Sequence, residues 1–215
     1  MFTHGSMRDL RQKILDVASR LAEEGGFNNV RQRDVAAEAG VALRTLYKRF
    51  RSKEDILSAV LVREVEAMKG RLQEEPIEGS TPVERVLSFF ELLSKTLFDK
   101  PQFARAVIRA VASGEPEVAN NVMSYHGQIT ELVIASMRGE GSLSGSDRLP
   151  TERETTLALL LQQLWFAAMV GWAGQLHGEA GVMEQVKLTA DLLDRGLTAR
   201  ATPPPAAVDA GEPGV

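Results

Sequence analysis

The chain has 215 residues, 44% of them hydrophobic and 25% charged, which is ordinary for a folded globular protein. It contains no cysteine, and this excludes disulfides, thiolate catalysis and cysteine-ligated metals. The net charge of −4 hides an asymmetry, because residues 1–53 carry 11 basic and 6 acidic side chains and the remainder carries 14 and 23. The N-terminal quarter is therefore the part suited to a polyanionic partner.

Two segments bear on targeting. Residues 1–13 contain no apolar run, so no signal peptide is expected, and residues 1–7 are predicted to be disordered or tag-derived. The uncharged stretch 155–178 is long enough to raise the question of a membrane span. Gln162, Gln163 and Gln175 interrupt it and no basic cluster flanks it, which favours a buried helix and predicts no membrane partner.

Apolar residues recur at helical spacing along almost the whole chain, and no segment shows a strong strand pattern. A first helix has its apolar stripe from Leu10 to Leu21 and ends at Gly25-Gly26. Two short helices follow at about 32–39 and 43–49. The run 52–55 resembles a capping box, with Asp55 in place of the usual Glu, and opens a fourth helix.

The rest of the chain also predicts helices. Thr81-Pro82-Val83-Glu84 is a strong helix start, and Lys100-Pro101 and Glu115-Pro116 begin two more. A Gly/Ser-rich loop at 139–150 precedes long helices at about 151–177 and 182–199. The prediction is an all-α fold of about nine helices. It comprises a three-helix head (1–53), a larger helical body (54–200) and a disordered Pro/Ala-rich tail (201–215).

Residues 31–53 have the layout of a helix-turn-helix. Small side chains stand where two helices would cross (Ala36 and Ala39), Gly40 suits the turn, and Val41 with Leu46 would fix the second helix. An ordinary αα-hairpin can share this pattern, so the pattern alone leaves that alternative open.

The distribution of charge favours DNA. Basic and hydrogen-bonding side chains crowd the second short helix and its flanks, as expected of a helix that enters the major groove. Lys and Arg hold phosphates, and Arg at the front of such a helix can contact guanine, for about 1–3 kcal/mol of discrimination. The predicted DNA-binding residues are Arg31, Arg33, Leu43, Arg44, Thr45, Tyr47, Lys48 and Lys53.

The motif Gly26-Phe27 … Val35-Ala36 … Ala39-Gly40-Val41 … Thr45-Leu46-Tyr47 … Phe50 … Ser52-Lys53-Glu54 … Leu57 resembles the TetR family of bacterial transcriptional regulators over residues 10–60. The resemblance implies an all-helical homodimer, whose heads read two half-sites of a palindrome and whose body binds a ligand. It also implies phosphate contacts for Thr45, Tyr47 and Lys53, and base contacts for residues 43 and 44.

Three positions depart from what is common in that family: Arg31 for Thr, Ala42 for Ser and Arg44 for Gly. Loss of Ser at 42 removes a helix cap worth about 1 kcal/mol. Arg44 adds a long side chain at the groove, so the operator of a relative with Gly there does not transfer to this protein.

The body is apolar and rich in Phe, Met and Trp, which favours a large apolar pocket, although ordinary core packing gives the same pattern. His126 is either a polar anchor in such a pocket or an ordinary hydrogen-bonded histidine. The predicted ligand-binding residues are Phe89, Phe90, Leu93, Phe103, Ile108, Met123, Tyr125, His126, Ile129, Trp165, Phe166 and Met169.

The helix at 151–177 is apolar almost all round, so both of its sides must be covered. The domain core can cover one side, and a second subunit is the simplest cover for the other. The predicted dimer residues, on this helix and the last one, are Leu161, Leu164, Ala168, Trp172, Val186, Ala190, Leu193 and Leu197.

The body also resembles, more faintly, the actinobacterial TetR-type repressors of lipid and steroid breakdown, through Thr81-Pro82, Leu164-Trp165 and Gly171-Trp172-Ala173. That implies a hydrophobic acyl or steroid effector, or its coenzyme A thioester. No catalytic motif of a helical enzyme is present, and His4 and His177 are too isolated for a metal site. The prediction is a cytoplasmic, ligand-responsive repressor without enzymatic activity, metal or cofactor; the alternative is a helical interaction module without sequence-specific DNA binding.

Overall fold

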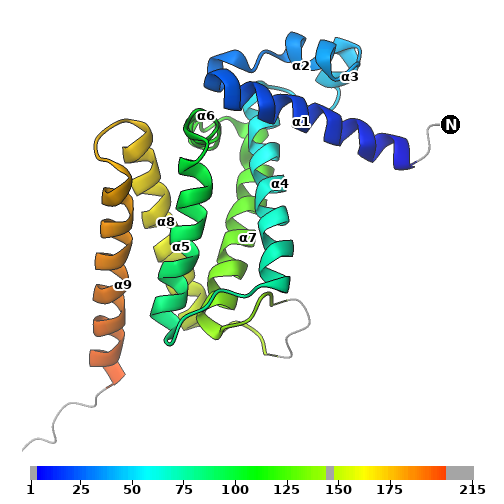
Figure 1. Cartoon of the computed structure of the whole chain (residues 1–215). Helices are drawn as coiled ribbons and strands as arrows, with labels where there is room; N and C mark the ends of the chain where they lie inside the picture. The colour runs from blue at the N-terminus through cyan, green and yellow to red at the C-terminus, as the bar shows by residue number, and fades with distance from the viewer. Residues whose placement is uncertain (1–3, 144–147, 202–215) are drawn as a thin grey trace, which may run out of the picture.

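The computed structural model describes residues 4–143 and 148–201, and in these ranges all regular structure is helical (Figure 1). The predicted all-α class is confirmed. Within the described ranges nine α-helices and one 3-10 turn follow in the order α1 (His4–Asn29), α2 (Gln32–Glu38), α3 (Leu43–Tyr47), α4 (Lys53–Glu74), α5 (Pro82–Phe98), α6 (Pro101–Val111), η1 (Pro116–Val118), α7 (Ala119–Arg138), α8 (Glu152–Ala173) and α9 (Glu179–Ala201).

The first helix begins earlier than predicted and breaks where predicted. α1 includes residues 4–7, for which the sequence predicts disorder, because no proline stops the helix there. At Gly25 and Gly26 the backbone leaves the helical region, and Gly26 has a φ of 69°, which glycine adopts without strain. One further turn then runs to Asn29. Residues 1–3 and the predicted tail from 202 onwards lie outside the described residues.

Side-chain caps fix the starts of three helices. Thr81 and Thr151 each form a complete capping box, with Glu84 and Glu154 respectively. At α4 the box is only half formed. The Ser52 hydroxyl accepts a hydrogen bond from the Asp55 amide, but the Asp55 carboxylate accepts one from the amide of Arg51, not from that of Ser52. Asp55 thus binds the amide of the residue before the cap, and the reciprocal bond to the Ser52 amide that would complete the box is not made.

The helices form two parts. In Figure 1, α1, α2 and α3 make a head at one end, and α4 runs from the head into a bundle made with α5 to α9. α6 lies directly beneath α1, and these two helices pack against each other extensively. One continuous core of buried side chains joins head and body, so the position of the head depends on how the body packs.

α8 ends earlier than predicted. The expected helix 151–177 stops at Ala173, and the chain turns through Gly174 and Gln175, whose φ is 63°. The Leu176 amide then donates to the Gly171 carbonyl, which caps the helix end. The uncharged run continued past this turn, so hydrophobicity alone did not mark the boundary.

Among the described residues, α8 is the one helix whose length and apolarity would suit a membrane span. Its buried residues, among them Leu161, Trp165 and Met169, pack into the core of the bundle. Packing against α6, α7 and α9 therefore accounts for one side of its apolar surface.

Candidate DNA-binding head and ligand cavity

The head is a helix-turn-helix built on a small core of its own. Val35 and Ala36 of α2 and Leu46 of α3 are buried against α1, and Phe50 closes the core behind them. Gly40 makes the turn with a φ of 68°, and the Val41 amide donates to the Ala36 carbonyl at 2.9 Å. These contacts hold α3 at a fixed angle to α2.

α3 presents its polar side to solvent. The side chains of Arg44, Tyr47 and Lys48 are exposed, and Tyr47 is 50% exposed although it is aromatic. Arg31 and Arg33 are exposed at the start of α2. Ala42 precedes α3 and offers no side-chain cap, so the loss expected from its identity is present in the structure.

The basic residues of this surface lack carboxylate partners within the part of the chain that the structure describes. Neither an ion pair nor a side-chain hydrogen bond engages Arg31, Arg33, Arg44 or Lys48 there. Elsewhere arginines are paired: Arg20 contacts Glu24 and Glu38, and Arg63 contacts Asp16. Unpaired cations on an exposed helix are free to bind phosphates at no cost in broken ion pairs. We call Arg31, Arg33, Arg44, Tyr47 and Lys48 the basic face.

Three other predicted DNA contacts are placed differently. Leu43 is half-buried and packs against the head core, and Thr45 is also half-buried. The Lys53 ammonium lies 3.8 Å from the centre of the Phe27 ring and within 3.5 Å of the Phe27 carbonyl oxygen. Lys53 is thus held against α1 instead of extending into solvent.

Phe27 also connects the head to the body. Its ring lies between two cations, because the Arg109 guanidinium from α6 is 4.1 Å from the ring centre. Each such contact adds about 0.5–2 kcal/mol depending on desolvation. Glu23 of α1 forms a further link, an ion pair of 2.8 Å with Lys100 at the start of α6.

A cavity of about 230 Å³ lies in the body immediately beneath α1. We call it the central cavity. Its walls come from six helices, which bring together residues far apart in sequence. They are Ser19, Glu23, Leu61, Glu64, Val65, Met68, Arg71, Leu93, Thr96, Leu97, Lys100, Phe103, Tyr125 and Trp165.

Four of the predicted ligand residues line this cavity: Leu93, Phe103, Tyr125 and Trp165. Phe89, Phe90, Ile108, Ile129 and Met169 are buried in the core without lining it. His126 and Phe166 are half-buried, with ring centres 6.5 Å apart.

The prediction that Met123 binds the ligand is wrong. Its side chain is 68% exposed on the solvent side of α7, so it does not line the central cavity. Met123 precedes Tyr125 by two positions, about 200° around a helix, and the two side chains therefore face opposite ways.

The buried polar side chains of the cavity, among them Tyr125 and Trp165, are uncharged and suit a neutral ligand end. Burial raises the pKa of the Tyr125 phenol, which therefore stays protonated at neutral pH. Its hydroxyl has no hydrogen-bond partner among the described residues and is available to a ligand. The Trp165 indole is already satisfied, because its Nε1 donates to the Ser94 hydroxyl at 2.8 Å.

The charged residues at the cavity were not predicted from the sequence. Glu23 lies on α1, Glu64 and Arg71 lie on α4, and Lys100 is the residue that precedes α6. The one feature of the sequence that could have indicated a charge at the cavity is Glu64, which stands directly beside Val65 in a helix whose other face is continuously apolar. Which charges meet at a rim is decided by how α1, α4 and α6 cross.

Most predicted dimer residues prove to be internal. Leu161, Ala168, Trp172, Val186 and Ala190 are at most 6% exposed in the single subunit, so they have no surface to offer a partner. Leu164 and Leu193 are half-buried, and Leu197 lies outside the residues whose side chains are described. A helix that is apolar all round does not reveal which side faces its own core.

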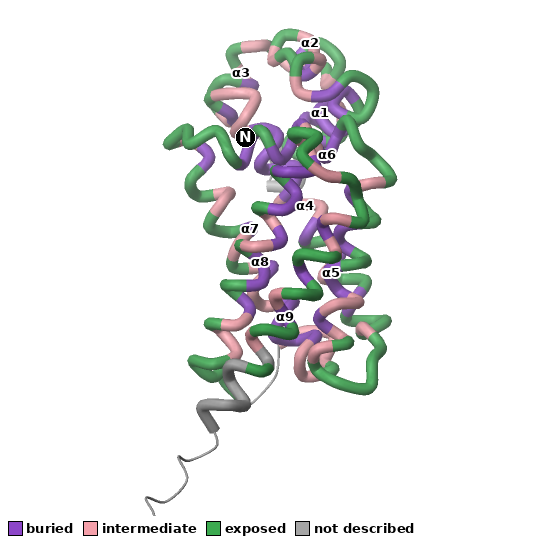
Figure 2. The backbone as a smooth tube through the Cα atoms, turned by 90° about the vertical axis from the view of Figure 1, so that its left-hand side faces the viewer, coloured by how far each residue is buried: buried purple, intermediate pink, exposed green. Residues whose placement is uncertain are grey.

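The exposed apolar residues of these helices lie on the other side. On α8 they are Leu159, Leu160 and Val170, and on α9 they are Leu188 and Leu192, each between 39% and 62% exposed. Figure 2 looks toward α9 and α8 and shows the exposed stretches along them. We call these five residues the apolar seam.

The comparisons with known proteins decide the family. Residues 14–60 match the model of the bacterial regulatory proteins of the tetR family, and residues 79–193 match the tetracyclin repressor-like C-terminal domain. The chain belongs to the TetR family. It is therefore a ligand-responsive, DNA-binding transcriptional regulator, and the alternative of a helical module without DNA binding is set aside.

Relatives extend this TetR assignment over most of the chain. The repressor KstR of Rhodococcus jostii is 28% identical over 87% of this chain and 84% of its own length. KstR of Mycobacterium tuberculosis is 27% identical over 87% and 82%.

Solved structures show the same fold. A TetR regulator from Rhodococcus sp. RHA1 superposes with a TM-score of 0.75 at 23% identity, over 87% of this chain and 96% of that one. Thermus thermophilus FadR in complex with lauroyl-CoA superposes with a TM-score of 0.67 at 17% identity, over 95% and 100%.

Proposed function

We propose that this TetR-family protein is a cytoplasmic repressor that binds a palindromic operator as a homodimer and is released by a hydrophobic small molecule. The observation that carries the proposal is the basic face around α2 and α3, whose cations form no ion pair with the described residues. The core that holds this face also surrounds the central cavity under α1. α3 would enter the major groove, with Arg44 at a base edge and Arg31, Arg33 and Lys48 on phosphates.

The homodimer would form across the apolar seam. Exposed Leu and Val side chains from two packed helices form an apolar patch that a second copy would cover, giving a four-helix interface with two-fold symmetry. Such a dimer would place two α3 helices about one turn of DNA apart, about 34–36 Å.

The effector would bind in the central cavity with its apolar part among Leu93, Phe103 and Trp165 and its polar end at Tyr125. A fatty acyl or steroid compound, free or as a thioester, has that chemistry, and the lauroyl-CoA bound to Thermus FadR supports this class. At about 230 Å³ the cavity is smaller than the roughly 300–1,000 Å³ of typical ligand sites. A fatty acyl or steroid ligand, which needs a cavity larger than about 230 Å³, would therefore push the surrounding helices apart.

That separation would act on DNA binding, because Ser19 and Glu23 of α1 form part of the wall. Moving α1 and α4 apart would change the spacing of the two heads. The ligand would favour the spread state by its better fit there, and operator affinity would fall by the same coupling factor.

DNA binding is tested first, with operators obtained by selection from random duplexes and affinity measured by fluorescence anisotropy across salt concentrations. We expect binding that weakens steeply with salt, since each neutralised phosphate contributes a slope of about −0.9. Absent or salt-insensitive binding would refute the proposal.

The effector is tested by thermal shift against fatty acids, acyl-CoA thioesters and steroids, followed by anisotropy with the operator. A true effector raises the melting temperature and weakens operator binding. Thr96→Trp, which fills the mouth of the central cavity from an exposed position, is expected to abolish both effects. A ligand that stabilises the protein and leaves operator affinity unchanged would contradict release by this route.

A further inference from the structure

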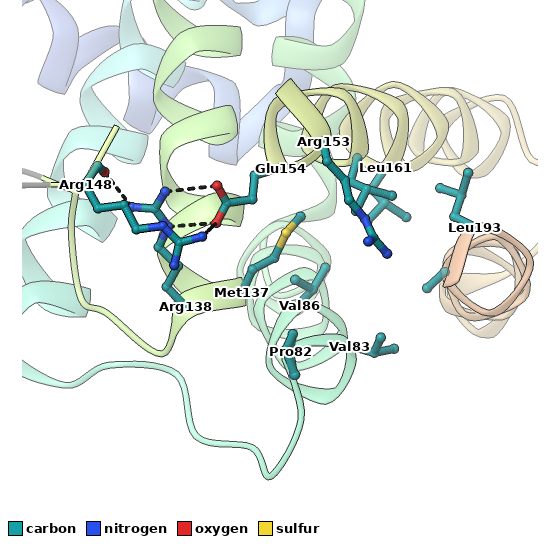
Figure 3. Close-up of a pocket in the computed structure, with 12 residues that line it drawn as sticks. Pro82, Val83, Val86, Met137, Arg138, Arg148, Arg153, Glu154, Leu161 and Leu193 are labelled. Atoms are coloured by element: carbon teal, nitrogen blue, oxygen red, sulfur yellow. Dashed lines mark hydrogen bonds and ion pairs between the residues drawn. The ribbon is translucent and has the colours of Figure 1, made fainter. Parts of the chain in front are cut away.

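A second cavity, of about 390 Å³, lies at the end of the body away from the head, between α5, α7, α8 and α9 (Figure 3). We call it the distal cavity. It shares no lining residue with the central cavity. Any molecule bound there would be separate from the effector proposed above.

The walls of the distal cavity are mostly aliphatic. Val83 and Val86 of α5, Leu157 and Leu161 of α8 and Leu193 of α9 line it, and Figure 3 shows Leu161 and Leu193 on the side away from Arg138. Such a surface favours a hydrocarbon chain over a polar molecule, because burying the chain removes apolar area from water.

The charges at this cavity are unequal. Its lining contains three arginines (Arg138, Arg148 and Arg153) and one carboxylate, that of Glu154. The carboxylate is already engaged by Arg138 through two hydrogen bonds, of 2.9 and 3.0 Å, and by Arg148 at 3.6 Å. The lining therefore carries an excess of positive charge.

Arg153 is the source of the excess positive charge, and its side chain lies beside the aliphatic wall that a ligand would contact. In Figure 3 its side chain extends from α8 between Leu161 and Leu193, away from the Arg138–Glu154 pair. It has no ion pair or side-chain hydrogen bond with the described residues. A guanidinium beside an aliphatic pocket matches the geometry of a carboxylate, which it can bind through two parallel hydrogen bonds.

We propose that the distal cavity binds an aliphatic carboxylate, with the chain along Val86, Leu161 and Leu193 and the carboxylate on Arg153. Because α8 and α9 also carry the apolar seam, the ligand would sit against the two helices that we expect to form the dimer.

The test is isothermal titration of the full-length protein with decanoate and, as a neutral match, decanol. We expect decanoate to bind the wild type, and Arg153→Gln to weaken it about tenfold or more through loss of a charge-assisted contact. Decanol should bind the wild type and Arg153→Gln within twofold of each other. If Arg153→Gln leaves decanoate affinity unchanged, the proposed site is wrong.

Two matched variants locate the site. Val83→Trp fills the distal cavity and should abolish the decanoate binding that depends on Arg153, whereas Thr96→Trp fills the mouth of the central cavity and should leave that binding intact. The opposite pattern would place decanoate in the central cavity and overturn the proposal. Arg153 is exposed and forms no ion pair or side-chain hydrogen bond with the described residues, so its variant gives an answer even if Val83→Trp folds poorly.

Discussion

At the scale of single residues, side-chain exposure and ion pairing distinguish the basic residues of the head that can contact DNA from those that hold the head together. Arg44 on α3 and Lys48, which follows its last residue, are both exposed and form no ion pair with the described residues, but they stand four positions apart, about one turn. Arg44 lies near the front of the helix, where a side chain reaches base edges, and Lys48 lies just after its end, where the DNA backbone would pass. Lys53, by contrast, is held on Phe27.

Arg44→Ala and Lys48→Ala should therefore weaken operator binding in different ways. Arg44→Ala is expected to cost about 1–3 kcal/mol on the selected operator and to relax the preference at one base pair. Lys48→Ala should weaken all sequences about equally and reduce the salt slope by about 1. Anisotropy titrations on selected and altered operators distinguish the two outcomes.

The control for both is Lys187→Ala, a basic residue on α9 that pairs with Glu91 far from the head. It should change operator affinity little. Equal loss of sequence preference in the Arg44 and Lys48 variants would mean that Arg44 does not read a base.

At the scale of helices, the start of α8 is tied to the end of α7 by one carboxylate. Glu154 closes the capping box with Thr151 and receives both hydrogen bonds from Arg138, whose side chain is only 5% exposed. Hydrogen bonding from Arg138 lowers the pKa of Glu154 to about 2. Since the folded-state pKa lies below the ordinary value near 4.5, this stabilisation is complete above about pH 4.5 and is lost as the pH falls toward 2.

Glu154→Gln is expected to lower the free energy of unfolding at pH 7 by about 1–3 kcal/mol, because it leaves a nearly buried arginine without its counter-charge. The difference between wild type and variant should shrink as the pH is lowered from 5 to 3. Urea unfolding followed by circular dichroism at several pH values measures both effects.

Glu84→Gln is the matched control, because Glu84 closes the same kind of capping box at α5 without an arginine partner. It should cost less at pH 7, because no arginine loses its counter-charge. Equal losses in the two variants would show that the cap, and not Arg138, sets the contribution of Glu154.

At the scale of the molecule, α1 and α6 join the head to the body, and α8 with α9 gives the body an uncovered apolar side. The first junction combines the Glu23–Lys100 ion pair with the two cations on Phe27. The second leaves Leu160, Leu188 and Leu192 exposed on neighbouring helices. In the function that we propose, the first junction would transmit a shift from the body to the head, and the second would fix the spacing of the two heads of a dimer.

Leu160→Asp should dissociate the homodimer by placing a charge in the apolar seam, at a cost of about 2 kcal/mol or more in association. Sedimentation velocity is expected to show a lighter species, and operator affinity should fall because two half-sites are no longer bound together. The control is Met123→Asp, which charges an apolar residue on α7 that is even more exposed than Leu160 and lies outside the seam. A Leu160→Asp dimer as stable as the wild type would place the interface elsewhere.

Local spacing, capping and charge are enough to predict the order of the helices, the turn at Gly40 and the basic residues around α2 and α3, but not the start of α1 or the end of α8. The sequence also identifies Arg44 and Ala42 as departures from the residues common in the TetR family, because a departure is recognised from the position in the motif alone. Tertiary structure decided which side of each helix is inside. Leu161 and Leu160 are adjacent and equally apolar, yet one is buried in the core and the other is exposed in the seam.

The positions of the two cavities also depend on tertiary structure. Both are bounded by residues from four or more helices, and their walls depend on crossing angles that no local pattern records. Helical spacing therefore does not reveal that Met123 faces solvent. The arginines of the distal cavity likewise come together only through the packing of α7 against α8.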